Sequence, residues 1–235
     1  MVLYVVMEKS DEDYLRRAAE SLVLHKLRLE ELSGWPCLMM RYPWVTAEVL
    51  ESYPFRALVI SGFGHGFEAL DIPDLYGLYD VLHTTRLPVL AICGGHQLLA
   101  HVFTQDFRQV QSLADEPMRR LQPGEPDWDH TYHPGYFVET GMQPVRVVQS
   151  DPLFAGLPET IYVRQAHYCE VKQLPPDFRL LASSENCRLQ AMRHGQRCVY
   201  GVQFHPEMYT AEYPDGQRIL SNFLAMAGVD AGASR

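Results

Sequence analysis

The segment PVLAICGGHQLLAH, residues 88–101, decides how the rest of the chain is interpreted. An apolar run ends at Cys93, two glycines follow, and the residues after them have helical spacing. The pattern predicts a buried strand over 87–93 that turns sharply into a helix over 95–103. The middle of a strand would bury a packing cysteine equally well. The position of Cys93 therefore raises the question of whether this thiol is part of a core or part of a reaction.

A junction of this kind offers three advantages to a nucleophile. The sharp turn exposes the side chain at the edge of the sheet, as in the nucleophile elbow of serine hydrolases. The positive end of the helix stabilises a thiolate. The backbone N–H of Gly94 is available to an oxyanion, and a second N–H would come from the glycine loop SGFGHG, residues 61–66. On this segment alone, a buried and unreactive cysteine remains the alternative.

The first half of the chain alternates short apolar strands with helices. Strands are expected over 2–7, 36–42, 55–62 and 87–93, and helices over about 10–29, 46–53, 75–86 and 95–103. In the first helix, Leu15, Ala18, Ala19, Leu22, Val23 and Leu29 are expected to form one apolar face. Alternation of this kind predicts an α/β fold with a mostly parallel central sheet and helices on both faces. Ligands bind such sheets at the carboxyl ends of the strands, where both glycine-rich segments fall.

The second half is richer in strand patterns. Strands are expected over 145–149, 161–167 and 179–184, a hairpin over 189–205 with its turn at His194-Gly195, and a closing helix over 216–228. Residues 114–136 contain four prolines and little periodicity, which predicts a long loop. We see no repeat or linker and expect a single domain over 1–235, with 229–235 as a frayed tail.

Composition and charge narrow the class of protein. The chain has 235 residues, of which 47% are hydrophobic and 21% charged, as in an ordinary globular protein. A net charge of −9 argues against a nucleic acid or an anionic membrane as the main partner. Five cysteines without a C-x-x-C pair favour a reducing compartment, and neither a signal peptide nor a membrane span is recognisable. The predicted localisation is cytoplasmic.

A nucleophilic cysteine needs a base, and the segment GVQFHPEMY, residues 201–209, offers one. His205 is followed two positions later by Glu207, and Pro206 fixes the backbone between them. A surface turn is the simpler interpretation of His-Pro-Glu. The H-x-E motif of zinc deaminases is excluded, because its P-C-x-x-C partner is absent from the sequence.

The remaining histidines give weaker signals. His130 and His133, with Asp129, lie in the 114–136 segment and are the candidates for a metal, although most histidines in such loops are solvated. His65 and His167 are expected near strand ends, where they would line a site without reacting. The sequence therefore predicts neither a metal nor a cofactor.

Together these segments resemble the class I, triad-type glutamine amidotransferase family. PVLAICGGHQLLA is similar to the nucleophile segment of that family, GVQFHPE to its His-Glu segment, and LVISGFG to its oxyanion loop. The stretch from Asp151 to Arg193 and the final GQRILSNFL also fit, so the resemblance spans nearly the whole chain. It implies a flavodoxin-like doubly wound sheet with a nucleophile elbow.

The resemblance also implies roles for single residues. Cys93 would attack the side-chain amide of glutamine and form a γ-glutamyl thioester, His205 would shuttle the proton, and Glu207 would orient His205. Ammonia would pass to a separate synthase chain, since no synthase domain is present. The oxyanion and substrate contacts would come from eight further residues, namely Gly62, Phe63, Gly64, Gly94, Gln97, His167, Tyr168 and Cys169.

The sequence departs from the family pattern at three places. Ala91 and Phe63 stand where the family usually has glycine, and His167-Tyr168-Cys169 replaces the more usual His-Gly-Asp or His-Ser-Leu. Two alternative functions therefore remain open at this stage. One is a γ-glutamyl peptidase or hydrolase that uses the same triad, and the other is a catalytically silent binding or regulatory subunit.

Overall fold

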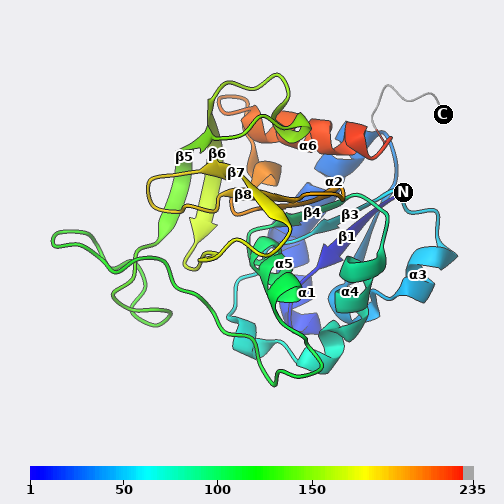
Figure 1. Ribbon diagram of the computed structural model, residues 1–235, viewed down its shortest axis with the longest axis horizontal. Coiled ribbons are helices and arrows are strands. Elements are labelled where there is room, and N and C mark those ends of the chain that lie inside the picture. Colours follow the sequence, from blue (N-terminus) through cyan, green and yellow to red (C-terminus); the bar gives the residue numbers. More distant parts are fainter. Residues whose placement is uncertain (230–235) are drawn as a thin grey trace.

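One nine-stranded mixed sheet organises the chain in the computed structural model, which describes residues 1–229 (Figure 1). The strand order is β2-β1-β3-β4-β9-β8-β7-β5-β6. The strands are β1 (Val2–Val6), β2 (Cys37–Arg41), β3 (Ala57–Ile60), β4 (Val89–Ile92), β5 (Glu139–Val147), β6 (Thr160–His167), β7 (Phe178–Ser183), β8 (Ala191–His194) and β9 (Val199–Val202).

The sheet has a parallel half and an antiparallel half. Strands β2, β1, β3, β4 and β9 run parallel, and β8, β7, β5 and β6 continue the sheet in antiparallel pairs. Residues of β1, β3, β4 and β9 are buried throughout, as expected for parallel strands that helices cover on both faces. The α/β fold with a mixed central sheet is thus confirmed.

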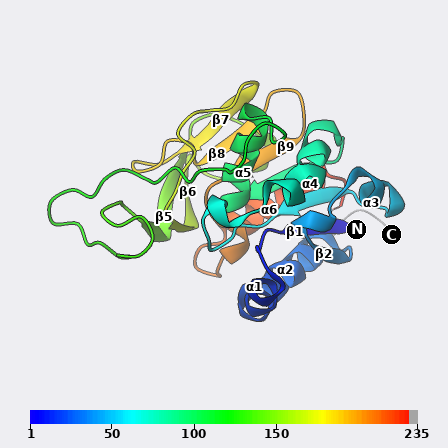
Figure 2. The ribbon, with the colours of Figure 1, turned by 90° about the horizontal axis from the view of Figure 1, so that it is seen from below.

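Helices pack against both faces of the sheet (Figures 1 and 2). Helices α4 and α5 share one apolar core with β1, β3 and β4, whereas α2 and α6 share a second core on the opposite face. The helices are α1 (Asp11–Arg17), α2 (Val23–Ser33), α3 (Ala47–Ser52), α4 (Ile72–Thr84), α5 (Gly94–Thr104) and α6 (Asp215–Met226). Short helical turns are η1 (Ala18–Leu22), η2 (Tyr42–Trp44), η3 (Phe67–Ala69), η4 (Pro152–Phe154) and η5 (Pro206–Met208).

The predicted apolar face of the first helix is wrong in part. Leu22 and Leu29 are buried, but Leu15 and Val23 are 67% and 44% exposed, and His25 is buried instead. The cause is η1, a π-helical turn between α1 and α2. A π turn inserts one extra residue, which rotates the helix that follows by about 100°. A regular helical spacing carried across residues 18–22 therefore selects the wrong side chains.

Two further differences concern segment ends. Strand β5 begins at Glu139, six residues before the predicted start, and it pairs with β6 so that Glu139 lies opposite His167. Val229, expected in a frayed tail, is buried and donates a backbone hydrogen bond to Leu224, while residues 230–235 of that prediction lie outside the described residues.

The 114–136 segment is largely irregular, as predicted. Part of it extends away from the rest of the molecule in both views (Figures 1 and 2). Isolated bridges join Pro117 to Cys169 and Arg120 to Tyr136, so its two ends are attached to the body and to each other. Within residues 1–229, no helix has the length and apolarity needed to cross a membrane.

Candidate active site

Cys93 occupies a strained turn between β4 and α5. Its backbone has φ 51° and ψ −112°, a conformation that residues other than glycine rarely adopt. The Cys93 N–H donates to the Val202 carbonyl of β9 at 2.8 Å, and the Cys93 carbonyl accepts from the Gln97 N–H at 3.1 Å. Surrounding structure must hold such a conformation in place, and strain of this kind gathers at functional positions. The nucleophile elbow predicted from residues 88–101 is present.

His205 and Glu207 form a buried pair directly after β9. His205 Nδ1 donates to Glu207 Oε1 at 2.7 Å. Pro206 begins η5 between them, so both side chains turn to the same side. The His205 N–H donates to the Arg164 carbonyl of β6 at 2.8 Å, and the Arg28 guanidinium donates to the Glu207 carbonyl oxygen. The backbone of the pair is therefore attached both to the sheet and to α2.

The opposite charges of His205 and Glu207 stabilise each other. Burial by itself disfavours the cation, but the Glu207 carboxylate and the Cys93 side chain raise the pKa of His205 well above its ordinary value. Burial likewise opposes ionisation of Glu207, yet His205 lowers the pKa of this carboxyl below its ordinary value. The physical cause in both cases is attraction between opposite charges in a dry site. The favoured state is an imidazolium held by a carboxylate.

Gly62, at the end of β3, separates Cys93 from His205. A Cβ atom added to Gly62 would lie 3.0 Å from Cys93 Cβ and 3.1 Å from His205 Cε1. Both side chains therefore pack against the bare Cα of this glycine. The Cys93 side chain is also near enough to contribute to the raised pKa of His205. The structure thus brings together two residues that are more than one hundred positions apart in the sequence.

Two residues behind Glu207 were missed in the sequence. The Tyr4 hydroxyl of β1 lies 3.0 Å from His25 Nδ1 of α2, and the same nitrogen lies 4.0 Å from Glu207 Oε1. Burial lowers the pKa of His25, so this ring is neutral and Glu207 is free to pair with His205. The available signal was the spacing of Leu22, His25 and Leu29, which places a histidine on an apolar face.

The predicted oxyanion site lies at the N-terminus of α5. Gly94 is the first residue of the helix, so its N–H has no acceptor within the helix. The Phe63 ring lies over Gly94, because a Cβ added there would come within 2.5 Å of the ring. Phe63 also stacks on His65 with ring centroids 4.7 Å apart, which fixes the ring. The Gly64 Cα faces open space.

Gln97 is held beside Cys93 by its neighbours. Its Nε2 donates to the Cys169 carbonyl at 2.7 Å and to Gln203 Oε1 at 3.1 Å. Gln203 Nε2 in turn lies 3.7 Å from Cys93 Sγ. Gln203, which the sequence reasoning missed, thereby links Gln97 to the thiol. Its signal was its place two residues before His205, directly after a buried strand.

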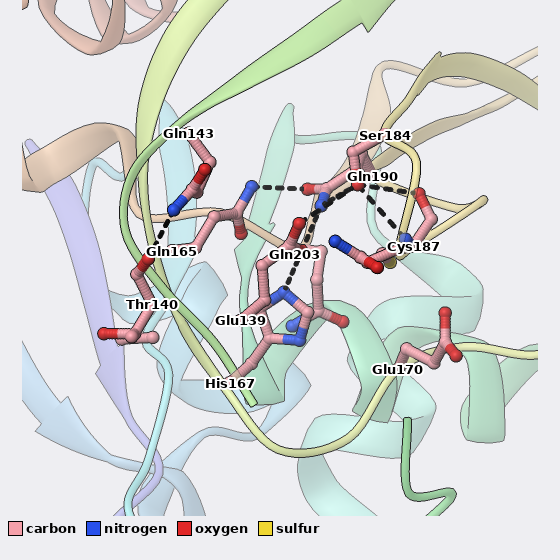
Figure 3. A network of polar contacts seen from close by, with 12 residues as sticks. Glu139, Thr140, Gln143, Gln165, His167, Glu170, Ser184, Cys187, Gln190 and Gln203 are labelled. Carbon is pink, nitrogen blue, oxygen red and sulfur yellow. Dashed lines mark hydrogen bonds and ion pairs between the residues drawn. The ribbon is translucent and has the colours of Figure 1, made fainter. Parts of the chain in front are cut away.

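His167 anchors the site and is not aimed at the thiol. Its Nε2 lies 2.9 Å from Glu139 Oε2 and its Nδ1 lies 3.0 Å from the Cys169 carbonyl oxygen. Figure 3 shows that Glu139 continues into a buried polar network, in which Gln190 Nε2 donates to Glu139 Oε2 at 2.8 Å and Gln165 donates to Gln190. Through the contact of His167 Nδ1 with the Cys169 carbonyl oxygen, this network helps to fix the backbone of residues 168–169.

A cavity of about 230 Å³ opens in front of Cys93. It brings together eight of the predicted site residues, whereas Gly62, His205 and Glu207 are not among the residues that line it. The eight are Phe63, Gly64, Cys93, Gly94, Gln97, His167, Tyr168 and Cys169. His65 and Ala166 also line the cavity, and so do Asp115, Asp129 and Tyr132 of the 114–136 segment. Tyr132 packs edge-on against Tyr168 with ring centroids 5.3 Å apart. The 114–136 segment therefore supplies one wall of the cavity.

Comparison with known proteins places this geometry in a family. The family model described as glutamine amidotransferase class-I matches residues 28–227. The chain belongs to the class-I glutamine amidotransferase family. The match contains the elbow, the glycine loop and the His-Glu pair, so the family resemblance and the fold it implied are confirmed.

A curated relative of this chain is a subunit of the glutamine-hydrolyzing GMP synthase of Pyrococcus abyssi. The two are 35% identical over 143 residues, which cover 61% of this chain and 62% of the relative. The chain therefore spans less than two thirds of that relative's length in the match. The corresponding protein of Archaeoglobus fulgidus is 35% identical over 167 residues, 71% of this chain and 73% of the relative.

Solved structures share the fold of this chain. The glutaminase domain of CTPS from Trypanosoma brucei, with bound acivicin, has a TM-score of 0.67 at 15% identity, and the match covers 97% of this chain and 94% of that one. A glutamine amidotransferase from Thermotoga maritima has a TM-score of 0.59 at 16% identity, with 96% and 97% covered.

Proposed function

We propose that this class-I amidotransferase hydrolyses the side-chain amide of glutamine through a γ-glutamyl thioester on Cys93 and donates the ammonia to a separate synthase subunit. The observation that carries the proposal is the arrangement of a thiol at a strained strand–helix turn with a buried His205–Glu207 pair 2.7 Å long, both packed on Gly62. A nucleophile, a base and a group that orients the base are the parts that acyl transfer requires.

The steps follow from these positions. The Cys93 thiolate attacks the amide carbon, and the N–H of Gly94 with a second N–H from the glycine loop binds the oxyanion. The His205 imidazolium gives its proton to the departing nitrogen, so ammonia leaves and the thioester remains. His205 then takes a proton from water, which attacks the thioester, and glutamate leaves with Cys93 restored. The sum is glutamine and water to glutamate and ammonia.

Charge in the cavity fits an amino acid substrate. Asp129 lines the cavity, and hydrogen bonds from Thr131 and from the backbone of Tyr132 lower the pKa of its carboxyl. An ionised carboxylate there would bind the α-ammonium group of glutamine. The cavity of about 230 Å³ is of the size of one small substrate and its water. We assign Asp129 to the recognition of this ammonium group.

The acceptor of the ammonia is proposed from the curated relatives. The names of the curated relatives describe one subunit of a glutamine-hydrolyzing GMP synthase. We therefore propose that the partner chain is another subunit of a GMP synthase. Glutamine-dependent GMP formation after addition of such a chain, with none when either chain is left out, is the expected result.

The test of the chemistry is glutamate release by the purified chain, first by itself and then with the synthase subunit. Cys93→Ser should reduce release from glutamine to background, because the hydroxyl is a far weaker nucleophile without a lowered pKa. Cys198→Ser is the matched control, since Cys198 is only half-buried and lies outside the cavity. Activity retained in Cys93→Ser, or lost equally in both variants, would refute the assignment.

The same assay separates the alternative functions. The tyrosine pair Tyr132–Tyr168 beside the cavity is the feature that favours a bulkier γ-glutamyl substrate. Release of glutamate from γ-glutamyl peptides but not from glutamine would indicate a γ-glutamyl hydrolase. No release from either substrate with a synthase subunit present, and no thioester on Cys93, would indicate a silent regulatory subunit.

A further inference from the structure

Three side chains that commonly bind transition metals meet beside the cavity. Asp115, His133 and Cys169 each offer one ligand atom, and these atoms lie within 4.8 Å of one another. Asp115 Oδ2 and His133 Nε2 are 3.4 Å apart. The residues come from three places in the sequence, two in the 114–136 segment and one after β6. The proposed glutaminase mechanism uses none of the three side chains.

Hydrogen bonds hold the segments that carry Asp115 and Cys169 in place. The Met118 N–H donates to the Tyr168 carbonyl at 3.0 Å, and the Glu170 N–H donates to the Glu116 carbonyl at 2.9 Å, so the two segments pair around Pro117 and Cys169. The Asp115 carboxylate is also held in place, because its Oδ1 accepts from the Phe67 N–H at 3.0 Å. Metal-binding carboxylates are typically oriented by such a second hydrogen bond.

His133 comes from the later part of the 114–136 segment and approaches Asp115 and Cys169. Its backbone has φ 52°, in the left-handed region that few residues other than glycine adopt. Its Nε2 atom is buried, and no hydrogen-bond partner for it lies within residues 1–229. A buried ring nitrogen beside a carboxylate oxygen is an unsatisfied group that a cation would satisfy.

We propose that Asp115, His133 and Cys169 bind a Zn²⁺ ion. Thiolate, imidazole and carboxylate are the ligands that Zn²⁺ takes in proteins, with bonds of about 2.0 to 2.3 Å to a tetrahedral ion. The fourth position would hold water. The Tyr132 hydroxyl donates to Asp115 Oδ2 at 2.9 Å and lies 3.8 Å from Cys169 Sγ, so it borders the site and would turn aside as the ligands converge.

Binding would release one proton. Zn²⁺ binds cysteine as the thiolate. Zn²⁺ would replace the proton, which passes to solvent as the S–Zn bond forms. The ion would then join the 114–136 segment to the backbone of Cys169, whose carbonyl accepts from Gln97. Zn²⁺ would thereby fix the wall that carries Tyr132 and Asp129 across the glutamine cavity.

Cobalt spectroscopy tests the site directly. Co²⁺ is added to the full chain in a Cys93→Ser background, so that the catalytic thiol does not bind the probe. One equivalent should produce a thiolate-to-cobalt absorption in the near ultraviolet and the visible bands of tetrahedral Co²⁺, and Zn²⁺ should abolish both. Cys169→Ser should remove the ultraviolet band, and His133→Ala should weaken binding at least about tenfold.

His130→Ala is the matched control, because this histidine lies in the same segment with its side chain 80% exposed. It should bind Co²⁺ as the parent does. A spectrum unchanged in both Cys169→Ser and His133→Ala, no thiolate band in the parent, or equal loss in His130→Ala would overturn the proposal. If Cys169→Ser fails to fold, His133→Ala alone decides the result.

Limited proteolysis supplies a readout independent of the spectrum. Trp128 is 67% exposed within the 114–136 segment and is a chymotrypsin site. At a Zn²⁺ concentration about ten times the measured Kd, cleavage after Trp128 should slow about tenfold, because the ion opposes local opening. The same Zn²⁺ should not slow cleavage in His133→Ala. Equal protection in both proteins, or none in the parent, would contradict a metal that fastens this segment.

Discussion

Replacement of Gly62 by alanine is expected to impair chemistry without impairing substrate binding. The added Cβ would stand 3.0 Å from Cys93 Cβ and 3.1 Å from His205 Cε1, whereas ordinary contact begins at 3.4 Å. The methyl group is therefore too close by about 0.4 Å on one side and about 0.3 Å on the other. Neither neighbour yields easily, because Cys93 is set in a strained turn and His205 is held by Glu207.

The expected loss follows from this displacement. A misplacement of about 1 Å between reacting groups costs on the order of 100-fold in rate. A combined displacement of about 0.7 Å should therefore lower kcat between about 10- and 100-fold. KM for glutamine should change little, because Gly62 does not line the cavity. Steady-state glutamate release, coupled to glutamate dehydrogenase, measures both quantities.

Gly64→Ala is the matched control for this prediction. Gly64 belongs to the same loop, but a Cβ added there meets nothing within 4 Å, and the backbone N–H is retained. Its kcat should stay within about twofold of the parent. Thermal unfolding of both variants shows whether the fold is intact. If Gly62→Ala turns over glutamine as fast as Gly64→Ala, then contact of Cys93 and His205 across this glycine does not matter for the reaction.

Three further predictions concern the pair, the substrate and the support behind the pair. Glu207→Gln should lower kcat at least about 100-fold, because an amide does not hold the His205 imidazolium. Because the pKa of Glu207 is lowered in the folded protein, its ionised carboxylate contributes stability that is present above pH 4.5 and is lost as the pH falls through the lowered pKa. The Tm of Glu207→Gln should therefore fall less than the Tm of the parent as the pH is lowered. Asp129→Asn should raise KM for glutamine about tenfold with kcat little changed, and N-acetylglutamine, which lacks the ammonium group, should be a poor substrate for both proteins. Tyr4→Phe should lower the free energy of unfolding in urea by about 1 kcal/mol, because His25 Nδ1 loses its buried partner; an unchanged unfolding midpoint would show that this contact contributes nothing.

Much of the parallel half of the fold could be predicted from the sequence. Its strands β1, β3 and β4 are short apolar runs, and a change of composition marks where each strand ends. Cys93 was identifiable because a thiol at a strand–helix junction has a local physical signature. His205 could be assigned as its partner only because both motifs occur in the order found in the family. Neither segment alone indicates where it lies in space.

The rest depends on structure that no local pattern records. Val23 was assigned to the buried face because helical spacing was carried through a π turn, which only packing reveals. Asp115, Asp129 and Tyr132 lie in a segment without periodicity, so their approach to the cavity could not be predicted. His133 was weighed as a metal ligand with its sequence neighbours, whereas the structure places it beside Asp115 and Cys169.

The most direct test of the account is to locate the acyl group. The chain, with its synthase subunit present, is mixed with glutamine, quenched in acid within the first turnovers, digested and analysed by mass spectrometry. The account predicts a γ-glutamyl group on the peptide that contains Cys93 and on no other cysteine peptide, and none in Cys93→Ser. Glutamate release without any acylated peptide, or a γ-glutamyl group on Cys169 in place of Cys93, would contradict it.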